Sequence, residues 1–249
     1  MRLDGKNVIV TGAASGISRA VALMAASYGA NIGAADLNEE GLKTVAAEIE
    51  KMGRKCVPVK TDVTNYDSVT AMVAKVKEGL GGKIDVLVNG VGWDIIEPFW
   101  KNPIDYWDKV IDVNYKSVIY CSRAVLDDMM EANEGRIINI ASDAGRGGSG
   151  GETVYAGAKG ATIAFTKSLA REVARFNILV NCVCPGPTDT PLFAGQPEKI
   201  RGALIKAIPL KRLAKPEEVA GQVILFASDL GSFMTAQIIS VSGGLTFYG

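Results

Sequence analysis

Residues 7–18 read N-V-I-V-T-G-A-A-S-G-I-S, a short apolar run followed by a glycine-rich turn. The run Asn7–Thr11 predicts a buried strand, and residues 16–28 predict a helix. A glycine-rich turn between a first strand and a first helix exposes backbone N–H groups that suit a pyrophosphate. Gly12 and Gly16 lack the side chains that would obstruct this approach. The unit therefore predicts the start of a dinucleotide-binding α/β fold.

The same alternation of apolar runs and amphipathic stretches continues along the chain. Six more strands are predicted, at residues 31–35, 56–60, 84–88, 136–140, 178–183 and 237–241. The further helices are predicted at residues 39–52, 66–80, 104–130, 155–175 and 216–228. Strands that alternate with helices imply right-handed crossovers and a parallel sheet covered on both faces. We therefore predict one α/β domain over residues 1–249, with a seven-stranded parallel sheet.

The stretch 190–213 has several glycines and prolines and is less regular than the rest. It follows the sixth predicted strand, at the edge where ligands bind in such sheets, so we predict a substrate lid within it.

Composition argues against several classes of protein. The 27 acidic and 27 basic residues balance, and no lysine-rich arm is present, so we expect no nucleic-acid partner. The first residues contain no apolar signal core, and no uninterrupted apolar run reaches about 18 residues. We therefore expect a cytoplasmic protein with no membrane partner.

The four cysteines, Cys56, Cys121, Cys182 and Cys184, do not fit a disulfide scaffold. Cys182 and Cys184 lie on one side of a predicted strand and could form a metal or redox pair. Because no histidine or second cysteine pair accompanies them, two small buried side chains are the favoured interpretation. No metal is predicted.

Asp36 follows the second predicted strand, about 20 residues beyond the glycine-rich turn. A carboxylate there can accept hydrogen bonds from a ribose 2′-hydroxyl and repels a 2′-phosphate. Ser15 in the turn is not basic, and no Arg or Lys is placed to neutralise such a phosphate. We predict NAD rather than NADP, and the alternative role for Asp36 is a helix cap.

Tyr155 and Lys159 are four residues apart, so their side chains share one face of the predicted helix. The chain contains no histidine, the usual proton carrier near pH 7. An ammonium one turn away can stabilise a phenolate, so we expect Lys159 to lower the pKa of Tyr155. Taken alone, such a pair is more often a solvated helix face.

The motifs, in their order and spacing, resemble those of single-domain short-chain dehydrogenases/reductases over essentially the whole chain. The matching elements are T-G-A-A-S-G-I-S (11–18), D-V (62–63), N-G-V-G (89–92), Asn114, Ser142, Y-A-G-A-K (155–159) and P-G-P-T-D-T (185–190). The resemblance implies a Rossmann fold with helices on both faces, a nicotinamide cofactor and a catalytic tetrad of Asn114, Ser142, Tyr155 and Lys159.

The resemblance also implies a role for each of these residues. Tyr155 would take the alcohol proton, Ser142 would bind the substrate oxygen, and Asn114 would hold a water that links Lys159 to solvent. The implied cofactor contacts are Gly12, Ser15, Gly16, Ile17, Asp36, Asp62, Val63, Asn89, Gly90, Tyr155, Lys159, Gly186, Thr188 and Thr190.

Three positions depart from the family pattern. Ser18 replaces a glycine of the turn, Gly90 replaces the second asparagine of N-N-A-G, and Ser242 stands where an acid is common. They put cofactor affinity and local rigidity in question, but none removes a catalytic group.

Three further stretches are similar to those of dehydrogenases that act on β-hydroxyacyl-CoA thioesters of cyclic acids, such as 2-hydroxycyclohexanecarboxyl-CoA, and of an aryl relative in anaerobic toluene breakdown. They are G-W-D (92–94), N-I-A-S-D-A-G-R (139–146) and V-C-P-G-P-T-D-T-P-L-F (183–193). The predicted function is NAD-dependent oxidation of such a secondary alcohol, as in anaerobic aromatic degradation. The alternatives are a 3-oxoacyl-thioester or polyol/sugar ketoreductase, and a non-catalytic dinucleotide-binding subunit of a heteromeric enzyme.

The candidate substrate residues flank the predicted catalytic groups. They are Trp93, Asp143, Arg146, Glu152, Pro187 and Phe193. Lid and core packing is the alternative role for the aromatic residues, and a solvated side chain is the alternative for Arg146. The family resemblance implies a homotetramer with the tail 241–249 at an interface. Assembly with a paralogous subunit is the alternative.

Overall fold

The computed structural model describes residues 1–247 and contains all seven predicted strands in one sheet. The strands are β1 (Asn7–Thr11), β2 (Asn31–Asp36), β3 (Cys56–Lys60), β4 (Val86–Asn89), β5 (Gly135–Ile140), β6 (Ile178–Pro185) and β7 (Ile238–Val241). Their order is β3-β2-β1-β4-β5-β6-β7, and all neighbours are parallel. The predicted fold class is confirmed. β4 begins two residues later than expected, and β6 runs two residues further.

Helices connect the strands, and the predicted ones end close to their expected limits. They are α1 (Gly16–Ser27), α2 (Glu39–Lys51), α3 (Tyr66–Leu80), α4 (Ile104–Ile111), α5 (Ser117–Glu131), α6 (Ala144–Gly147), α7 (Thr153–Val173), α8 (Pro191–Ala194), α9 (Glu198–Ala207) and α10 (Pro216–Ala227). Of these, α6, α8 and α9 were not predicted. Short 3₁₀ turns occur at η1 (Phe99–Lys101), η3 (Ala174–Phe176) and η4 (Asp229–Gly231). None of the helices in residues 1–247 has the length and apolar character needed to cross a bilayer.

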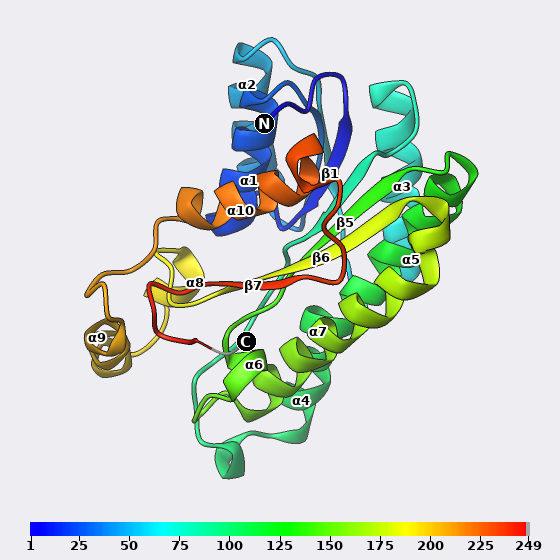
Figure 1. The fold of residues 1–249 in the computed structure, drawn as a ribbon. Coiled ribbons are helices and arrows are strands. Elements are labelled where there is room, and N and C mark those ends of the chain that lie inside the picture. The colour runs from blue at the N-terminus through cyan, green and yellow to red at the C-terminus, as the bar shows by residue number, and fades with distance from the viewer. Residues whose placement is uncertain (248–249) are drawn as a thin grey trace.

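Helices cover both faces of the sheet (Figure 1). Alternating side chains of the strands pack in two main cores, one on each face. Along β1, Val8 and Val10 pack in the core beneath α1, α2 and α10, whereas Ile9 packs against α3, α5 and α7. Because both faces are buried, the strands are apolar throughout, and this made them visible in the sequence.

The predicted helix at residues 104–130 is continuous but not uniform. A π-helical turn, η2 (Asp112–Lys116), joins α4 to α5. Such a turn inserts extra chain into a helix and often marks a functional site. Here it contains Asn114.

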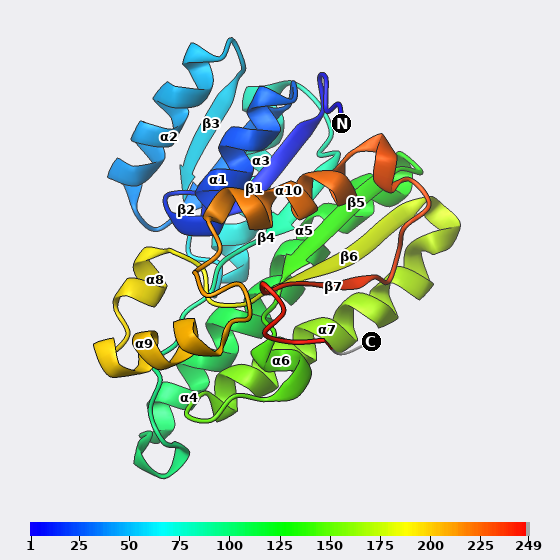
Figure 2. The same cartoon turned by 60° about the vertical axis from the view of Figure 1, so that its left-hand side comes forward.

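The stretch 190–213 is more regular than expected, because it forms α8 and α9. Thr190 starts α8 by accepting a hydrogen bond from the Phe193 N–H at 3.3 Å. Figure 2 shows both helices next to each other, outside the sheet. Whether they move as a lid stays a prediction.

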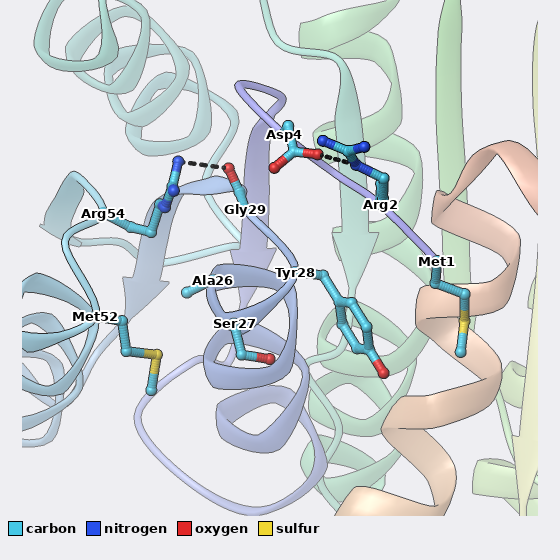
Figure 3. A pocket seen from close by; sticks show the side chains of 9 residues that line it. All are labelled: Met1, Arg2, Asp4, Ala26, Ser27, Tyr28, Gly29, Met52 and Arg54. Atoms are coloured by element: carbon cyan, nitrogen blue, oxygen red, sulfur yellow. Dashed lines mark hydrogen bonds and ion pairs between the residues drawn. The ribbon is translucent and has the colours of Figure 1, made fainter.

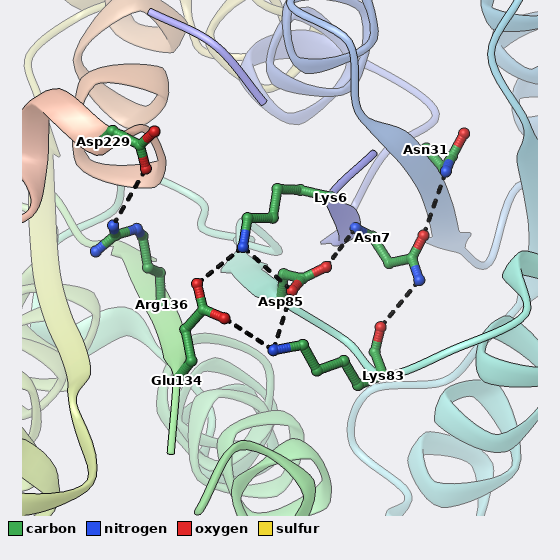
Figure 4. A network of polar contacts seen from close by, with 8 residues as sticks. All are labelled: Lys6, Asn7, Asn31, Lys83, Asp85, Glu134, Arg136 and Asp229. Atoms are coloured by element: carbon green, nitrogen blue, oxygen red, sulfur yellow. Dashed lines mark hydrogen bonds and ion pairs between the residues drawn. The ribbon is translucent and has the colours of Figure 1, made fainter. Parts of the chain in front are cut away.

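The amino-terminal ends of β1, β4 and β5 are joined by a polar network (Figure 4). The Glu134 carboxylate lies 2.8 Å from Lys6 Nζ and 2.9 Å from Lys83 Nζ. Both ammonium groups lie 3.5 Å from Asp85 Oδ1, and Asp85 Oδ2 accepts the Asn7 N–H at 2.8 Å. The two lysines lower the pKa of Glu134 to about 2.

Candidate active site

A cavity of about 630 Å³ opens at the carboxyl-terminal ends of the strands, beside the point where the strand order reverses between β1 and β4. Ligands bind at this position in open parallel sheets. A smaller hollow of about 330 Å³ lies near the amino terminus (Figure 3). There Arg2 pairs with Asp4 at 2.6 Å, and Arg54 donates to the Gly29 carbonyl at 3.3 Å. The larger cavity is the candidate active site.

The first turn forms one wall of the cavity. Gly12 and Gly16 have φ angles of +73° and +57°, a region that favours glycine. Ser15 precedes the first turn of α1, and it lines the cavity together with Ile17. The turn therefore presents the start of α1 to the cavity, as expected for a phosphate-binding turn.

Asp36 closes the same wall from the end of β2. Its Oδ2 accepts the Ala14 N–H at 3.0 Å, and its Oδ1 accepts the Asn38 N–H at 2.9 Å. The cap of α2 is Asn38, whose side chain accepts the Gly41 N–H. The helix-cap alternative for Asp36 is therefore wrong, and its carboxylate holds the first turn while lining the cavity.

Nearby basic side chains are paired with acids. Lys60, in register with Asp36 on β3, has its Nζ 3.6 Å from Glu39. Arg19 on α1 lies 2.6 Å from Glu48.

Ser142, Tyr155 and Lys159 meet on the opposite wall. Ser142 follows β5, its Oγ accepts the Ala144 N–H at 3.1 Å, and it lines the cavity together with Tyr155 and Lys159. Lys159 Nζ lies 5.6 Å from the centre of the Tyr155 ring and donates to the Ile140 carbonyl at 3.0 Å. Lys159 is 2% exposed, so the solvated-face alternative for this pair is wrong.

The protein shifts the pKa values of Lys159 and Tyr155 in opposite directions. Burial lowers the pKa of Lys159 to about 8. Burial and the charge of Glu152 raise the pKa of Tyr155, and the hydrogen bond from Ser142 offsets only part of this. The expected lowering of the Tyr155 pKa by Lys159 is therefore wrong for the protein alone, because desolvation of the phenolate and the charge of Glu152 raise that pKa.

Asn114 is fully buried and braces the loop after β4. Its Nδ2 donates to the Trp93 carbonyl at 2.7 Å, and its Oδ1 accepts the Trp93 N–H at 3.2 Å. A Cβ placed on Gly92 would lie 3.3 Å from Asn114 Oδ1 and 3.5 Å from Lys159 Nζ, so both groups flank the same glycine. The four residues of the predicted tetrad are thus brought together. The water relay stays a prediction.

Cys182 and Cys184 on β6 lie below this wall, fully buried, with their sulfur atoms 3.9 Å apart. Within residues 1–247, no group of three or more His, Cys, Asp or Glu side chains could hold a metal ion.

Some predicted cofactor residues lie outside the cavity lining. Asp62 Oδ1 accepts the Thr64 N–H at 2.9 Å, and Val63 is 6% exposed. Asn89 braces the sheet by donating to Asn139 Oδ1 at 2.9 Å. Lining residues include Gly90, Gly186, Thr188 and Thr190.

Four of the six predicted substrate residues line the cavity: Asp143, Glu152, Pro187 and Phe193. Trp93 does not line the cavity. Its ring instead contacts Lys109, whose Nζ lies 3.8 Å from the ring centre. Arg146 is also absent from the lining and donates to Ser240 Oγ at 2.6 Å.

Two further residues, Asp94 and Gln196, also line the cavity. Gln196 joins the 190–213 segment to the loop after β4, because its Oε1 accepts the Ile96 N–H at 3.1 Å and its Nε2 donates to the Asp94 carbonyl at 3.3 Å. Asp94 is 5% exposed, and its Oδ1 accepts from the Tyr106 hydroxyl at 2.6 Å. Burial and nearby Glu152 raise the pKa of Asp94 to about 7. The sequence placed Asp94 of G-W-D after the fourth strand, near the substrate, but gave no signal for Gln196.

Comparison with known proteins identifies the family. A family model described as Enoyl-(Acyl carrier protein) reductase matches residues 12–246. The 3-oxoacyl-[acyl-carrier-protein] reductase FabG of Thermotoga maritima is 40% identical, over 98% of this chain and 99% of its own. A crystal structure described as a short-chain alcohol dehydrogenase of Sinorhizobium meliloti superposes with a TM-score of 0.91 at 30% identity, over 98% of this chain and 97% of that one.

The chain is a short-chain dehydrogenase/reductase. It is therefore an oxidoreductase of a family that binds a nicotinamide dinucleotide. A further relative, the (2S)-[(R)-hydroxy(phenyl)methyl]succinyl-CoA dehydrogenase subunit BbsD of Thauera aromatica, is 34% identical over all of this chain and 99% of its own.

Two departures from the short-chain dehydrogenase/reductase pattern compensate for each other. A Cβ at position 90 would lie 2.1 Å from Ser18 Oγ, which is too close for any real contact. Ser18 occupies that space and donates to the Gly90 carbonyl at 3.2 Å. The Gly90 N–H donates to Thr11 Oγ1 at 3.0 Å. Position 90 thus stays fixed through its backbone, without the side chain that the pattern would supply.

Proposed function

We propose that this enzyme oxidises a secondary alcohol to a ketone with NAD, and that the alcohol is a cyclic or aryl β-hydroxyacyl-CoA thioester. The observation that carries the proposal is the meeting of Ser142, Tyr155 and Lys159 across one cavity from Asp36.

The cavity fits a nicotinamide dinucleotide on its own features. The left-handed glycines of the first turn leave the start of α1 open to a pyrophosphate, and Asp36 suits a ribose hydroxyl. A 2′-phosphate at Asp36 would meet a carboxylate, while the nearby Lys60 and Arg19 are already paired. These contacts support NAD over NADP.

The protein's own groups would handle the proton. An alcohol carbon cannot release hydride until its O–H proton leaves, and Tyr155 is the group placed to receive that proton. Ser142 would hold the substrate oxygen against Tyr155, and Lys159 would stabilise the phenolate. The bound nicotinamide would supply the hydride acceptor and, when oxidised, a positive charge.

The substrate side supports an acyl substrate with an apolar ring. Ile96, Leu192, Phe193 and Leu204 line the cavity from two facing segments. The relative BbsD acts on an aryl-substituted acyl-CoA, according to its name.

The test is NADH formation, followed by absorbance, from purified protein mixed with 2-hydroxycyclohexanecarboxyl-CoA and simple alcohols. NAD and NADP are compared at equal concentration, and we expect kcat/KM to favour NAD by about tenfold or more. Equal use of both cofactors would contradict the role given to Asp36.

A 3-oxoacyl-thioester reductase is the second candidate, and two observations favour it. The FabG relative of Thermotoga maritima is 40% identical, and the raised pKa of Tyr155 favours the protonated phenol that reduction requires. Assaying both directions with the same acyl chain distinguishes the two functions. Faster reduction with NADPH than oxidation with NAD would select the reductase.

We further propose a homotetramer, with the tail from Val241 onward at an interface; Tyr248 and Gly249 of this tail lie outside the described residues. Light scattering on the purified chain tests this. A lone inactive chain that gains activity with a paralogous subunit would favour heteromeric assembly instead.

A further inference from the structure

Two carboxyl groups lie on the substrate side of the cavity. Asp94 belongs to the loop after β4, and Glu152 immediately precedes α7; both line the cavity. One oxygen of Asp94 accepts from Tyr106, but the other, Oδ2, is buried without a hydrogen-bond partner among residues 1–247. An unpartnered buried oxygen is costly in the absence of a ligand, so its place in a cavity wall points to a bound group.

The loop that carries Asp94 is fixed from both sides. Asn114 holds the backbone of Trp93 by two hydrogen bonds. Gln196, from the segment after β6, donates to the Asp94 carbonyl. The position of this carboxyl is therefore built into the fold and is not that of a mobile surface side chain.

The two carboxyl groups interact, because the charge of Glu152 is among the causes that raise the pKa of Asp94. Glu152 also accepts a hydrogen bond from Ser149. Because Asp94 is buried beside the charge of Glu152, its carboxyl takes a proton more readily than an exposed carboxyl does. A protonated Asp94 then offers an O–H donor beside the negative charge of Glu152.

No free cation accompanies this pair. Among the described residues that line the cavity, Lys159 is the only Lys or Arg, and its ammonium donates to the Ile140 carbonyl beside Tyr155. Of the other lining acids, Asp143 is bound by Ser240 and Thr246, and Asp36 lies on the cofactor side. A substrate carboxylate near Asp94 would thus meet negative charge without compensation.

We propose that the Asp94–Glu152 pair selects the group next to the carbinol, donating a hydrogen bond to a neutral acyl carbonyl and repelling a free carboxylate. In a β-hydroxyacyl thioester only one carbon separates the carbinol carbon from the carbonyl carbon. With the carbinol at Ser142 and Tyr155, that carbonyl would lie near Asp94 and Glu152, because both acids are close enough to Tyr155 for their charges to raise its pKa. The inference rests on the proposed function, because the catalytic residues set the carbinol's position.

The experiment compares two probes that differ in charge and by one methyl group. They are methyl 2-hydroxycyclohexanecarboxylate and 2-hydroxycyclohexanecarboxylate, each oxidised with NAD at pH 7. We expect the wild-type kcat/KM to favour the ester by at least about tenfold. In the double variant Asp94→Asn/Glu152→Gln the ratio should fall by at least about tenfold, through faster oxidation of the free acid. Each single variant keeps one carboxylate and should retain most of the preference.

Asp105→Asn is the matched control, since Asp105 is an exposed acid of α4 outside the cavity lining. A second measurement needs no variant: cyclohexanecarboxamide should inhibit ester oxidation at least about tenfold more strongly than cyclohexanecarboxylate. Equal use of both probes by the wild type, or an unchanged ratio in the folded double variant, overturns the inference and leaves the proposed oxidation standing. If neither probe gives NADH, the proposed substrate class fails and the inference fails with it.

Discussion

The two ends of the parallel sheet shift the pKa values of their carboxyl groups in opposite directions. At the amino-terminal end, Glu134 is shared between Lys6 and Lys83, and its pKa falls to about 2. At the carboxyl-terminal end, Asp94 has one oxygen without a partner, and its pKa rises. Paired charges at the first end favour the folded state, whereas crowded and desolvated groups at the second are poised for a ligand. The unpaired, desolvated groups mark the carboxyl-terminal end as the candidate site, independently of any related protein.

The largest expected effect lies at the carboxyl-terminal end. Tyr155→Phe should lower kcat by about a thousandfold or more, because the variant keeps the ring but loses the group that carries the proton. NAD affinity, measured by the shift in melting temperature with cofactor, should not change. Tyr120→Phe, on α5 and outside the cavity lining, is the control and should keep full activity. Substantial NADH formation by Tyr155→Phe would show that Tyr155 is not the group that accepts the alcohol proton.

The compensation between Ser18 and Gly90 should appear as non-additivity. Gly90→Ala places a Cβ against Ser18 Oγ and should cost about 1–3 kcal/mol of stability and weaken cofactor binding. Adding Ser18→Gly should restore part of both losses, because it removes the clash with Ser18 Oγ and leaves the Thr11 carbonyl 3.0 Å from the added Cβ. Chemical denaturation and cofactor titration of the double-mutant cycle measure this.

Gly221→Ala is the control, since nothing lies within 4 Å of its added Cβ. Strictly additive effects of Ser18→Gly and Gly90→Ala would show that the two positions are independent.

The smallest effect is expected at the amino-terminal end. Glu134→Gln should cost about 1 kcal/mol near pH 7, because the side chain is 43% exposed and solvent screens its pairs. Since the folded pKa lies below the ordinary value, the stabilisation is present above about pH 4 and is lost as the pH falls toward 2.

Denaturation of both proteins between pH 3 and 7 tests this, and the stability difference should shrink at the acid end. Asp127→Asn, which breaks one exposed pair with Arg123, should change little. A constant difference between Glu134→Gln and wild type across that range would refute the pairing.

The sheet could be predicted from the sequence because strands buried on both faces leave continuous apolar runs, as in Val8, Ile9 and Val10. The grouping of the predicted tetrad could be anticipated, because the spacing of its residues is fixed by the chain itself or by a motif. The π-helical turn at Asn114 could not, since one inserted residue hardly alters the apolar pattern of a helix.

The environment of Asp94 could not be predicted for a related reason. It lies on an irregular loop, where burial leaves no periodic signal, and its environment is built by Tyr106, Glu152 and Gln196 from elsewhere in the chain. The pKa of Tyr155 was misjudged because a charge–charge estimate between two residues omits desolvation by all the others.

The absence of histidine has a consequence for how this protein responds to pH. Surface carboxylates and ammonium groups keep their charge as the medium moves from mildly acidic to mildly alkaline, so the exterior presents a nearly constant face. Asp94 and Lys159 have been moved inward from opposite ends of the scale, to about 7 and about 8. Groups that change charge near neutral pH are therefore concentrated in the cavity. A change of one charge there alters ligand binding but hardly alters the net charge of the surface.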